Sequence, residues 1–305
     1  MSSPCPCRER PLHWMIALAM ISVASSSLLA SVDEATQVSN HQLFAIRPDG
    51  SKVKQITDEP TFRFGSAYWS PDGKQIAADR APANQNVQAT DVVLMDADGG
   101  NVRDLGPGSM PSWSPDGKLL TFHVYDGDGS IVVAQANGEG REEVAAHWGS
   151  PRWTADPRYI VSIFKYRAFA VLDLKTGDEQ VIALAGGSSP YPGFDLSADG
   201  KRICYGDASR GGLVVADVDE KYRLSNFQRF LGSDRCTFCS WSPDAKRVVF
   251  SKQMGLGAMS QLFILDVDSG DPPDVLIGQN PTAANVNPQW SPDGEWIIYS
   301  SDLPE

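Results

Sequence analysis

The chain has 305 residues and a mass of 33.0 kDa. Hydrophobic residues make up 42% and charged residues 21%, as in an ordinary globular protein, which excludes wholesale disorder. The formal net charge is −12 and the pI is about 4.8. An acidic protein repels phosphate backbones, so we expect no nucleic-acid partner.

The N-terminal segment has the pattern of a secretory signal peptide. Arg8 and Arg10 precede the apolar run WMIALAMISVA at 14–24, and small residues follow it. We therefore predict a signal peptide over 1–30, with an approximate cleavage point, and a short linker over 31–42. The alternative is a retained membrane anchor, for which the apolar stretch is short. No later stretch approaches a transmembrane span. Because a signal peptide directs export, the mature protein is expected outside the cytoplasm.

A short string recurs through the rest of the chain. It reads WSPDGK in its fullest form, and six copies begin at Trp69, Trp113, Trp153, Leu196, Trp241 and Trp290. The spacings are 44, 40, 43, 45 and 49 residues. A period in this range indicates a repeat architecture, and about 44 residues is the size of a four-stranded propeller blade.

We call each copy of this string an anchor. Every repeat has the same internal order, in which the anchor is followed by strands. Runs rich in β-branched and aromatic residues alternate with polar turns, which predicts strands. Pro, Asp and Gly in the anchor favour a tight turn between the first two strands, and Trp is large enough to fill the gap between neighbouring sheets. We predict a strand also over 224–231, although its apolar residues have a loosely helical spacing.

The two ends of the repeat region complement each other. Residues 43–57 match the second half of a unit and residues 286–302 match the first half. Together they make a sixth blade, which closes the ring and protects sheet edges. The predicted fold is therefore an all-β six-bladed β-propeller over 43–302, with one blade shared between the N- and C-terminal segments.

Five cysteines occur, of which Cys5 and Cys7 lie in the predicted signal peptide. Cys204, Cys236 and Cys239 remain. If the segment Cys236–Cys239 is a regular strand, side-chain alternation points its two thiols to opposite faces. The alternatives are buried structural thiols or one disulfide between Cys204 and one of the pair; a redox motif is disfavoured because no helix follows.

The WSPDGK anchors, the Asp-Gly turns and the six units resemble the β-propeller of the TolB-like, WD-repeat-like family over about 43–302. The resemblance implies a periplasmic docking platform for a lipoprotein partner, as in the Tol-Pal system, with no catalytic activity. The sequence departs from TolB in lacking its N-terminal α/β domain. The same repeats also accompany peptidase domains and occur as independent binding modules.

In a propeller the first strand of each blade lines the channel. The residues one and three before each anchor are therefore expected there, namely Tyr68, Ser112, Arg152, Asp195, Ser240, Gln289, Ser66, Met110, Ser150, Gly193, Phe238 and Asn287. Nearer one mouth we place Arg63, Phe64, His147, Trp148, Tyr191 and Arg235. Arginine and aromatic residues favour interfaces, which suggests a partner or ligand that carries a carboxylate. The alternative is a solvated channel without a ligand.

No enzyme signature is present. The sequence has no Gly-x-Ser-x-Gly motif, and His41, His123 and His147 lie in different repeats. We assign no catalytic residue, no metal ligand and no cofactor. The favoured function is an exported scaffold that docks a protein or peptide at one mouth of the channel. The alternatives are a lyase-type or split-peptidase accessory domain, or a small-molecule or glycan sensor.

Overall fold

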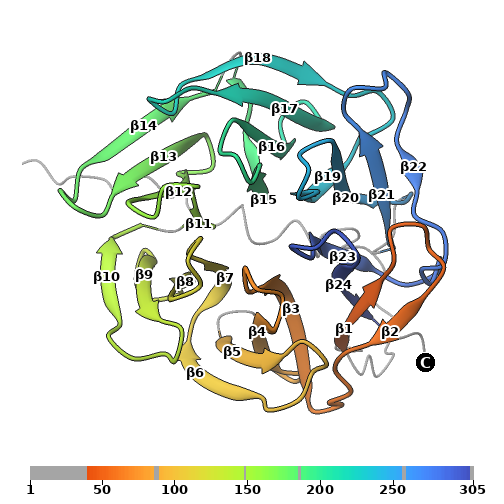
Figure 1. Ribbon diagram of the computed structural model, residues 1–305, viewed down its shortest axis with the longest axis horizontal. Coiled ribbons are helices and arrows are strands. Elements are labelled where there is room, and N and C mark those ends of the chain that lie inside the picture. The colour runs from red at the N-terminus through yellow and green to blue at the C-terminus, as the bar shows by residue number, and fades with distance from the viewer. Residues whose placement is uncertain (1–39, 86–88, 148, 185–186, 256–258, 303–305) are drawn as a thin grey trace, which may run out of the picture. The chain divides into compact units, whose positions relative to one another are not determined.

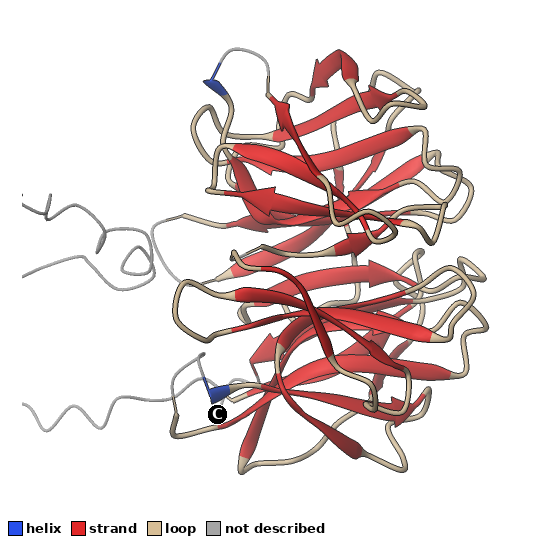
Figure 2. Cartoon of the chain, turned by 90° about the vertical axis from the view of Figure 1, so that its left-hand side faces the viewer, coloured by secondary structure: helices blue, strands red, loops and turns tan. Residues whose placement is uncertain are grey.

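The computed structural model describes residues 40–302 apart from 86–88, 148, 185–186 and 256–258. These residues form six four-stranded antiparallel sheets, arranged as blades around a central axis (Figure 1). The strands run between two faces that carry the loops (Figure 2). The predicted six-bladed, all-β propeller is confirmed, whereas the predicted signal peptide and the linker up to residue 39 lie outside the described residues.

The first strand of each blade lies nearest the axis and the fourth lies at the rim. Blade 1 contains β3 (Phe62–Trp69), β4 (Gln75–Pro82), β5 (Asp91–Asp96) and β6 (Arg103–Pro107). Blade 2 contains β7 (Ser109–Trp113), β8 (Leu119–Val124), β9 (Ser130–Gln135) and β10 (Glu142–Ala145). Blade 3 contains β11 (Arg152–Trp153), β12 (Tyr159–Phe164), β13 (Ala168–Asp173) and β14 (Glu179–Ala183).

Blades 4 to 6 repeat this order. Blade 4 contains β15 (Pro190–Leu196), β16 (Arg202–Asp207), β17 (Leu213–Val218) and β18 (Leu224–Arg229). The strand predicted over 224–231 is therefore present, but it ends two residues earlier than expected. Blade 5 contains β19 (Cys236–Trp241), β20 (Arg247–Gln253), β21 (Ser260–Asp266) and β22 (Asp274–Val275). Blade 6 contains β23 (Asn285–Trp290), β24 (Ile297–Asp302), β1 (His41–Ile46) and β2 (Val53–Gln55).

Blade 6 closes the ring as the sequence predicts. β1 pairs antiparallel with β24, from His41 opposite Asp302 to Ile46 opposite Ile297. β1 begins two residues before the expected start at 43. The Ser300 hydroxyl of β24 also donates to the Phe64 carbonyl of β3 at 2.8 Å, which ties blade 6 to blade 1.

Each anchor is a tight turn between the first and second strands, as predicted. In blade 1 the Asp72 carboxylate accepts from the Ser70 hydroxyl at 2.7 Å and from the Lys74 N–H at 3.2 Å. The Ser70 oxygen accepts in turn from the N–H of Gln75 at 2.9 Å. Blades 2, 4, 5 and 6 repeat this arrangement. The anchor therefore stabilises itself, and its serine takes part as well as its aspartate. We call the face that carries these turns the anchor face and the opposite one the mouth face.

The anchor tryptophans pack between blades. Trp113 of blade 2 is buried against Ala77, Val92 and Leu94 of blade 1. Trp290 of blade 6 fills the corresponding place against blade 5. The predicted role of these rings as inter-blade spacers is confirmed.

Five of the six first strands carry a β-bulge or register irregularity within the six residues before the anchor. In β19 the bulge falls between Cys236 and Cys239, because Cys236 pairs with Lys252 but Cys239 pairs with Phe250. The extra residue cancels the alternation, so both thiols enter the same hydrophobic cluster as Cys204. The prediction that they point to opposite faces is wrong. All three are free, buried thiols.

One anchor has alanine where the others mostly have glycine. Ala245 has a φ of 55°, in the left-handed region, whereas Gly73 at the same place in blade 1 has a φ of 70°. We expect Ala245→Gly to raise the free energy of unfolding by about 0.5 kcal/mol, because relief of the strained backbone exceeds the lost methyl contact. Gly73→Ala should lower it by about 1 kcal/mol for the converse reason. Urea denaturation measures both, and changes of equal sign would contradict this account.

Candidate functional site

The predicted channel residues converge at the axis. A cavity of about 10 Å³ is lined by Ser66, Tyr68, Arg152, Gly193, Phe238, Cys239, Asn287 and Pro288. Six of these belong to the predicted set, and Cys239 and Pro288 are additional. A cavity of this size holds about one water molecule. The channel is therefore filled by side chains at this level.

Arg152 is the central part of this filling. It is only 4% exposed, and its guanidinium lies 4.2 Å from the centre of the Tyr68 ring and 5.8 Å from that of Phe194. Its Nη1 donates to the Pro151 carbonyl at 2.8 Å. The cation therefore lies on aromatic faces, an arrangement that strengthens when water is excluded.

The approach of Phe238 to the axis requires glycine at position 193. A Cβ added to Gly193 would lie 2.1 Å from a ring carbon of Phe238. The phenylalanine of blade 5 thus packs directly on the backbone of blade 4, and this contact contributes to the closed axis.

Asp195 connects two blades close to Arg152. Its carboxylate accepts from the N–H of Trp241 at 2.9 Å, across the blade boundary, and from the N–H of Leu196 at 3.0 Å. Burial raises the pKa of Asp195 to about 6, although the hydrogen bond from Trp241 and the charge of Arg152 oppose this shift. Burial likewise raises the pKa of Tyr68 well above its usual range, against the effect of Arg152.

Several buried polar atoms around the axis have no partner among the described residues. They are Nη2 of Arg63, Nε of Arg152, Oδ1 of Asn287 and Oε1 of Gln289. Asn287 also has a φ of 54°, which asparagine tolerates better than most residues. Buried polar atoms are normally satisfied, often by ordered water. The axis is therefore a place where water would be held.

Three further predicted residues, Tyr191, Arg235 and His147, lie nearer the mouth face. Tyr191 is 36% exposed at the start of β15. Arg235 is exposed, and its guanidinium donates to the Gly255 carbonyl. His147 Nε2 lies 2.5 Å from Oε1 of Glu179, with its ring against Phe164. Trp148 lies outside the described residues.

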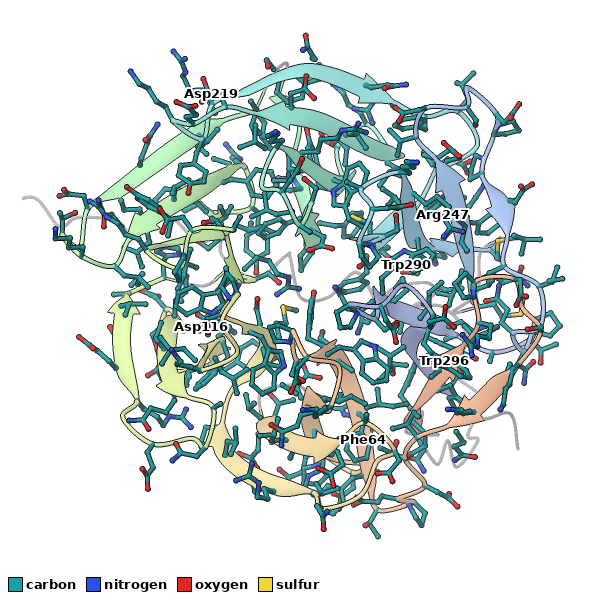
Figure 3. The ribbon with its side chains drawn as sticks, viewed as in Figure 1. Phe64, Asp116, Asp219, Arg247, Trp290 and Trp296 are labelled. Atoms are coloured by element: carbon teal, nitrogen blue, oxygen red, sulfur yellow. The ribbon has the colours of Figure 1, made fainter. Side chains whose placement is uncertain are left out.

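Phe64 does not lie at the mouth as expected. It is 1% exposed and belongs to the core between blades 1 and 6 (Figure 3). The bulge between Phe64 and Ala67 in β3 shifts the alternation, which explains the difference.

Two buried aspartates were not recognised from the sequence. Asp79 on β4 accepts from the Ser109 hydroxyl at 2.8 Å and from the Met110 N–H at 3.1 Å, which links blade 1 to blade 2. Asp207 on β16 accepts from Arg229 at 2.6 Å. Burial opposes ionisation of Asp207, but hydrogen bonds led by the one from Arg229 hold its pKa well below the usual range. Asp79 lies in the middle of β4 and Asp207 is the last residue of β16, so no shared position in the repeat signals them.

Within the described part of the chain, no group of three or more His, Cys, Asp or Glu side chains is placed to hold a metal ion. Among the same residues, no helix is long and apolar enough to cross a membrane.

The raised pKa of Asp195 predicts a pH-dependent stability difference. The folded state binds this proton more tightly than the unfolded chain, whose aspartates have a pKa near 3.9. The stability contributed by Asp195 is therefore present at low pH and is lost as pH rises from about 4 to about 6. Relative to the wild type, Asp195→Asn should gain up to about 3 kcal/mol in free energy of unfolding over this range. Urea denaturation at several pH values measures it, and a pH-independent difference would contradict the pKa.

The buried position of Arg152 predicts a structural defect when it is removed. Arg152→Ala should lower the free energy of unfolding by about 3 kcal/mol at pH 7, because Asp195 loses its neighbouring cation and Tyr68 its stacked partner. Arg235→Ala, at an exposed position, should change it by less than about 0.5 kcal/mol. Thermal or urea denaturation compares the two, and equal stability of both variants would show that Arg152 does not support the axis.

The chain has limited sequence similarity to known proteins. No family model matches the chain. A 101-residue stretch is 38% identical to the uncharacterized protein Atu1656 of Agrobacterium fabrum and covers 28% of this chain. The chain spans only 32% of the length of that relative.

Two solved structures resemble the whole propeller. The putative TolB from Agrobacterium tumefaciens aligns with a TM-score of 0.69 and 19% identity, over 87% of this chain and 99% of that one. TolB from Acinetobacter baumannii aligns with a TM-score of 0.57 and 19% identity, over 87% of this chain and 64% of that one. At this identity the likeness concerns the fold, and the chain therefore has a six-bladed β-propeller fold similar to that of these TolB structures.

Proposed function

We propose that this protein is an exported, non-catalytic scaffold that docks a protein or peptide partner on its mouth face, around the entrance of the central channel. The fold supports the general role, because propellers of this kind serve as interaction platforms. Tyr191 and Arg235 are exposed on adjacent blades at this face. Aromatic and arginine side chains are enriched at the centres of protein interfaces.

The observation that carries the proposal is the filled axis. Arg152 and Tyr68 leave a cavity of about 10 Å³, whereas small-molecule sites have volumes of about 300–1,000 Å³. The channel at this level therefore offers no space for a substrate or a glycan. A partner would bind to the surface above it, which favours a macromolecule over a small ligand.

The charge of the mouth face suggests the chemistry of the partner. We place Arg235, which is exposed, and Arg63, which is half-buried, at this face of a chain whose net charge is −12. A partner segment with a carboxylate would pair with these guanidinium groups, since arginine binds carboxylates well. By its resemblance to TolB, we propose a lipoprotein of the cell envelope in a Tol-Pal-like system, with this protein in the periplasm after cleavage of the predicted signal peptide.

A capture experiment with matched variants tests the mouth face. Immobilised wild-type protein is incubated with an envelope extract, and bound proteins are identified by mass spectrometry. Tyr191→Ala/Arg235→Ala removes one aromatic and one arginine side chain from the mouth face. Phe227→Ala/Arg103→Ala removes the same side-chain types from exposed positions on outer strands.

We expect the wild type and the Phe227/Arg103 variant to capture the same envelope protein. The Tyr191/Arg235 variant should bind this protein about tenfold more weakly, because the lost interface contacts are worth about 1.4 kcal/mol. Equal capture by all three proteins would contradict docking at the mouth face. Loss with the Phe227/Arg103 variant alone would place the interface at the rim.

A further inference from the structure

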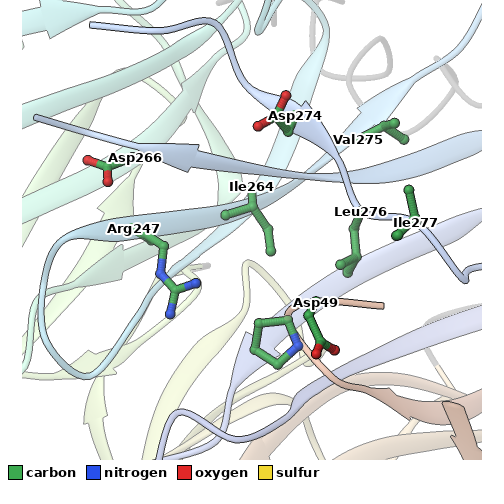
Figure 4. A pocket seen from close by; sticks show the side chains of 9 residues that line it. Asp49, Arg247, Ile264, Asp266, Asp274, Val275, Leu276 and Ile277 are labelled. Atoms are coloured by element: carbon green, nitrogen blue, oxygen red, sulfur yellow. The ribbon is translucent and has the colours of Figure 1, made fainter. Parts of the chain in front are cut away.

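A groove of about 270 Å³ lies at the rim, between blade 5 and the β1–β2 turn of blade 6 (Figure 4). We call it the rim groove. β21 contributes Ile264 and Asp266, and the turn contributes Asp49. The segment from β22 onward contributes Asp274 and Ile277. None of these residues belongs to the channel or to the mouth face.

The short outer strand of blade 5 explains why the groove exists. β22 has two residues, and its pairing places Asp274 opposite Ile264, so that Pro273 would fall opposite Leu265. Proline has no N–H to donate, which ends the strand there. The outer edge of blade 5 is therefore open where other blades continue.

Close backbone contact holds the other side of the groove in place. A Cβ added to Gly278 would lie 2.4 Å from the carbonyl oxygen of Gly50, so the chain after β22 touches the β1–β2 turn directly. The Gln279 side chain also bonds to both backbone groups of Leu262, at 2.8 and 2.9 Å. The rim groove is thus a built feature of the blade 5–blade 6 junction.

The groove presents an apolar surface to solvent. Leu276 is 3% exposed at its base, whereas Val275 is 44% and Ile277 is 66% exposed. Large apolar side chains beside a concave surface commonly mark an interaction site.

The charges around this apolar surface are unbalanced. Three carboxylates, those of Asp49, Asp266 and Asp274, line the groove with one cation, Arg247, which leaves an excess of two negative charges. Arg247 is opposite Asp266 in the strand pairing, yet its guanidinium lies 4.8 Å from the centre of the Trp290 ring (Figure 3). Across the residues that the structure describes, none of the three carboxylates has a cationic nitrogen within 4.0 Å.

We propose that the rim groove docks a basic segment of a second protein partner. A lysine side chain fits both features, because its aliphatic stem would cover Ile264 and Ile277 while its ammonium lies among the carboxylates. The volume is below that of typical sites for small organic ligands, which favours one or two side chains of a larger partner. Asp49 and Asp266 lie at the anchor face, so this partner and one on the mouth face would not compete.

A pentapeptide provides a direct probe. Acetyl-Leu-Lys-Leu-Lys-Leu-amide is titrated into isotope-labelled protein, and amide chemical shifts are followed by NMR. We expect saturable shifts at Ile264, Asp266 and 275–277, and no such shifts with the peptide in which glutamate replaces lysine. Shifts that spread over all acidic turns, or none at the groove, would overturn the proposal.

Matched variants separate the groove from general acidity. Asp49→Asn/Asp266→Asn should weaken peptide binding by about fivefold, as expected for two partly screened charge contacts. Asp96→Asn/Asp98→Asn removes two carboxylates from the corresponding places in blade 1, where Asp98 caps the N–H of Gly100 as Asp49 caps that of Ser51. This control should bind within about twofold of the wild type.

An apolar variant completes the test. Ile277→Ser should also weaken the peptide, whereas Val181→Ser, at a 50% exposed position on β14, should not. Equal losses in groove and control variants would show attraction by net charge alone and overturn the proposal. These outcomes do not depend on the mouth face, because neither Tyr191 nor Arg235 is changed.

Discussion

The pairing of β1 with β24 is the constraint on which the rest of the structure depends. It joins residues 41–46 to residues 297–302 in one blade, so that the first and last described strands hold each other in place. Every other blade packs on two neighbours, and this blade completes both of its interfaces only when the pairing forms. Closure also leaves no open inter-blade face that would seek another partner. The Trp113 and Trp290 rings between blades and the hydrogen bonds of Asp79 and Asp195 across blade boundaries then fix the spacing of the ring.

Closure determines what the centre of the molecule can do. The first strands converge on the axis and carry the side chains that line it. Arg152 on Tyr68, and Phe238 on the backbone of Gly193, fill the space that a wider ring would leave open. Asp195 at the axis holds two blades together, because its carboxylate accepts a hydrogen bond from the N–H of Trp241 in the neighbouring blade. Surface recognition is consequently the favoured function of this propeller. The two faces and the rim offer separate surfaces, with the Tyr191 and Arg235 region on one and the rim groove beside the other.

Much of the architecture could be predicted from the sequence because the information is local and repeated. The six anchors give the number of blades, and Ser70 and Asp72 form their hydrogen bonds within a few residues of each other. The half-units at 43–57 and 286–302 predict the shared blade. The convergence of Tyr68, Arg152 and Asn287 at the axis could also be predicted, since position relative to the anchor determines it.

What could not be predicted depends on distant neighbours or on register. Strict alternation misplaced Phe64 and the thiols of Cys236 and Cys239, because a bulge adds one residue to β3 and one to β19. The burial of Arg152 depends on rings from blades 1 and 4, which no local pattern reveals. Asp207 and the rim groove depend on tertiary contacts in the same way. The groove arises where Pro273 ends an outer strand beside the turn of a blade from the other end of the chain.

The central claim, docking on the mouth face above a filled axis, is tested most directly by hydrogen–deuterium exchange of the full propeller with and without its captured envelope partner. The account predicts protection at the starts of the first strands, in residues 189–193 and 233–237, with unchanged exchange in the anchor turns at 70–74 and 114–118. Protection confined to the anchor turns, or spread along the outer strands with none at the mouth, would contradict it.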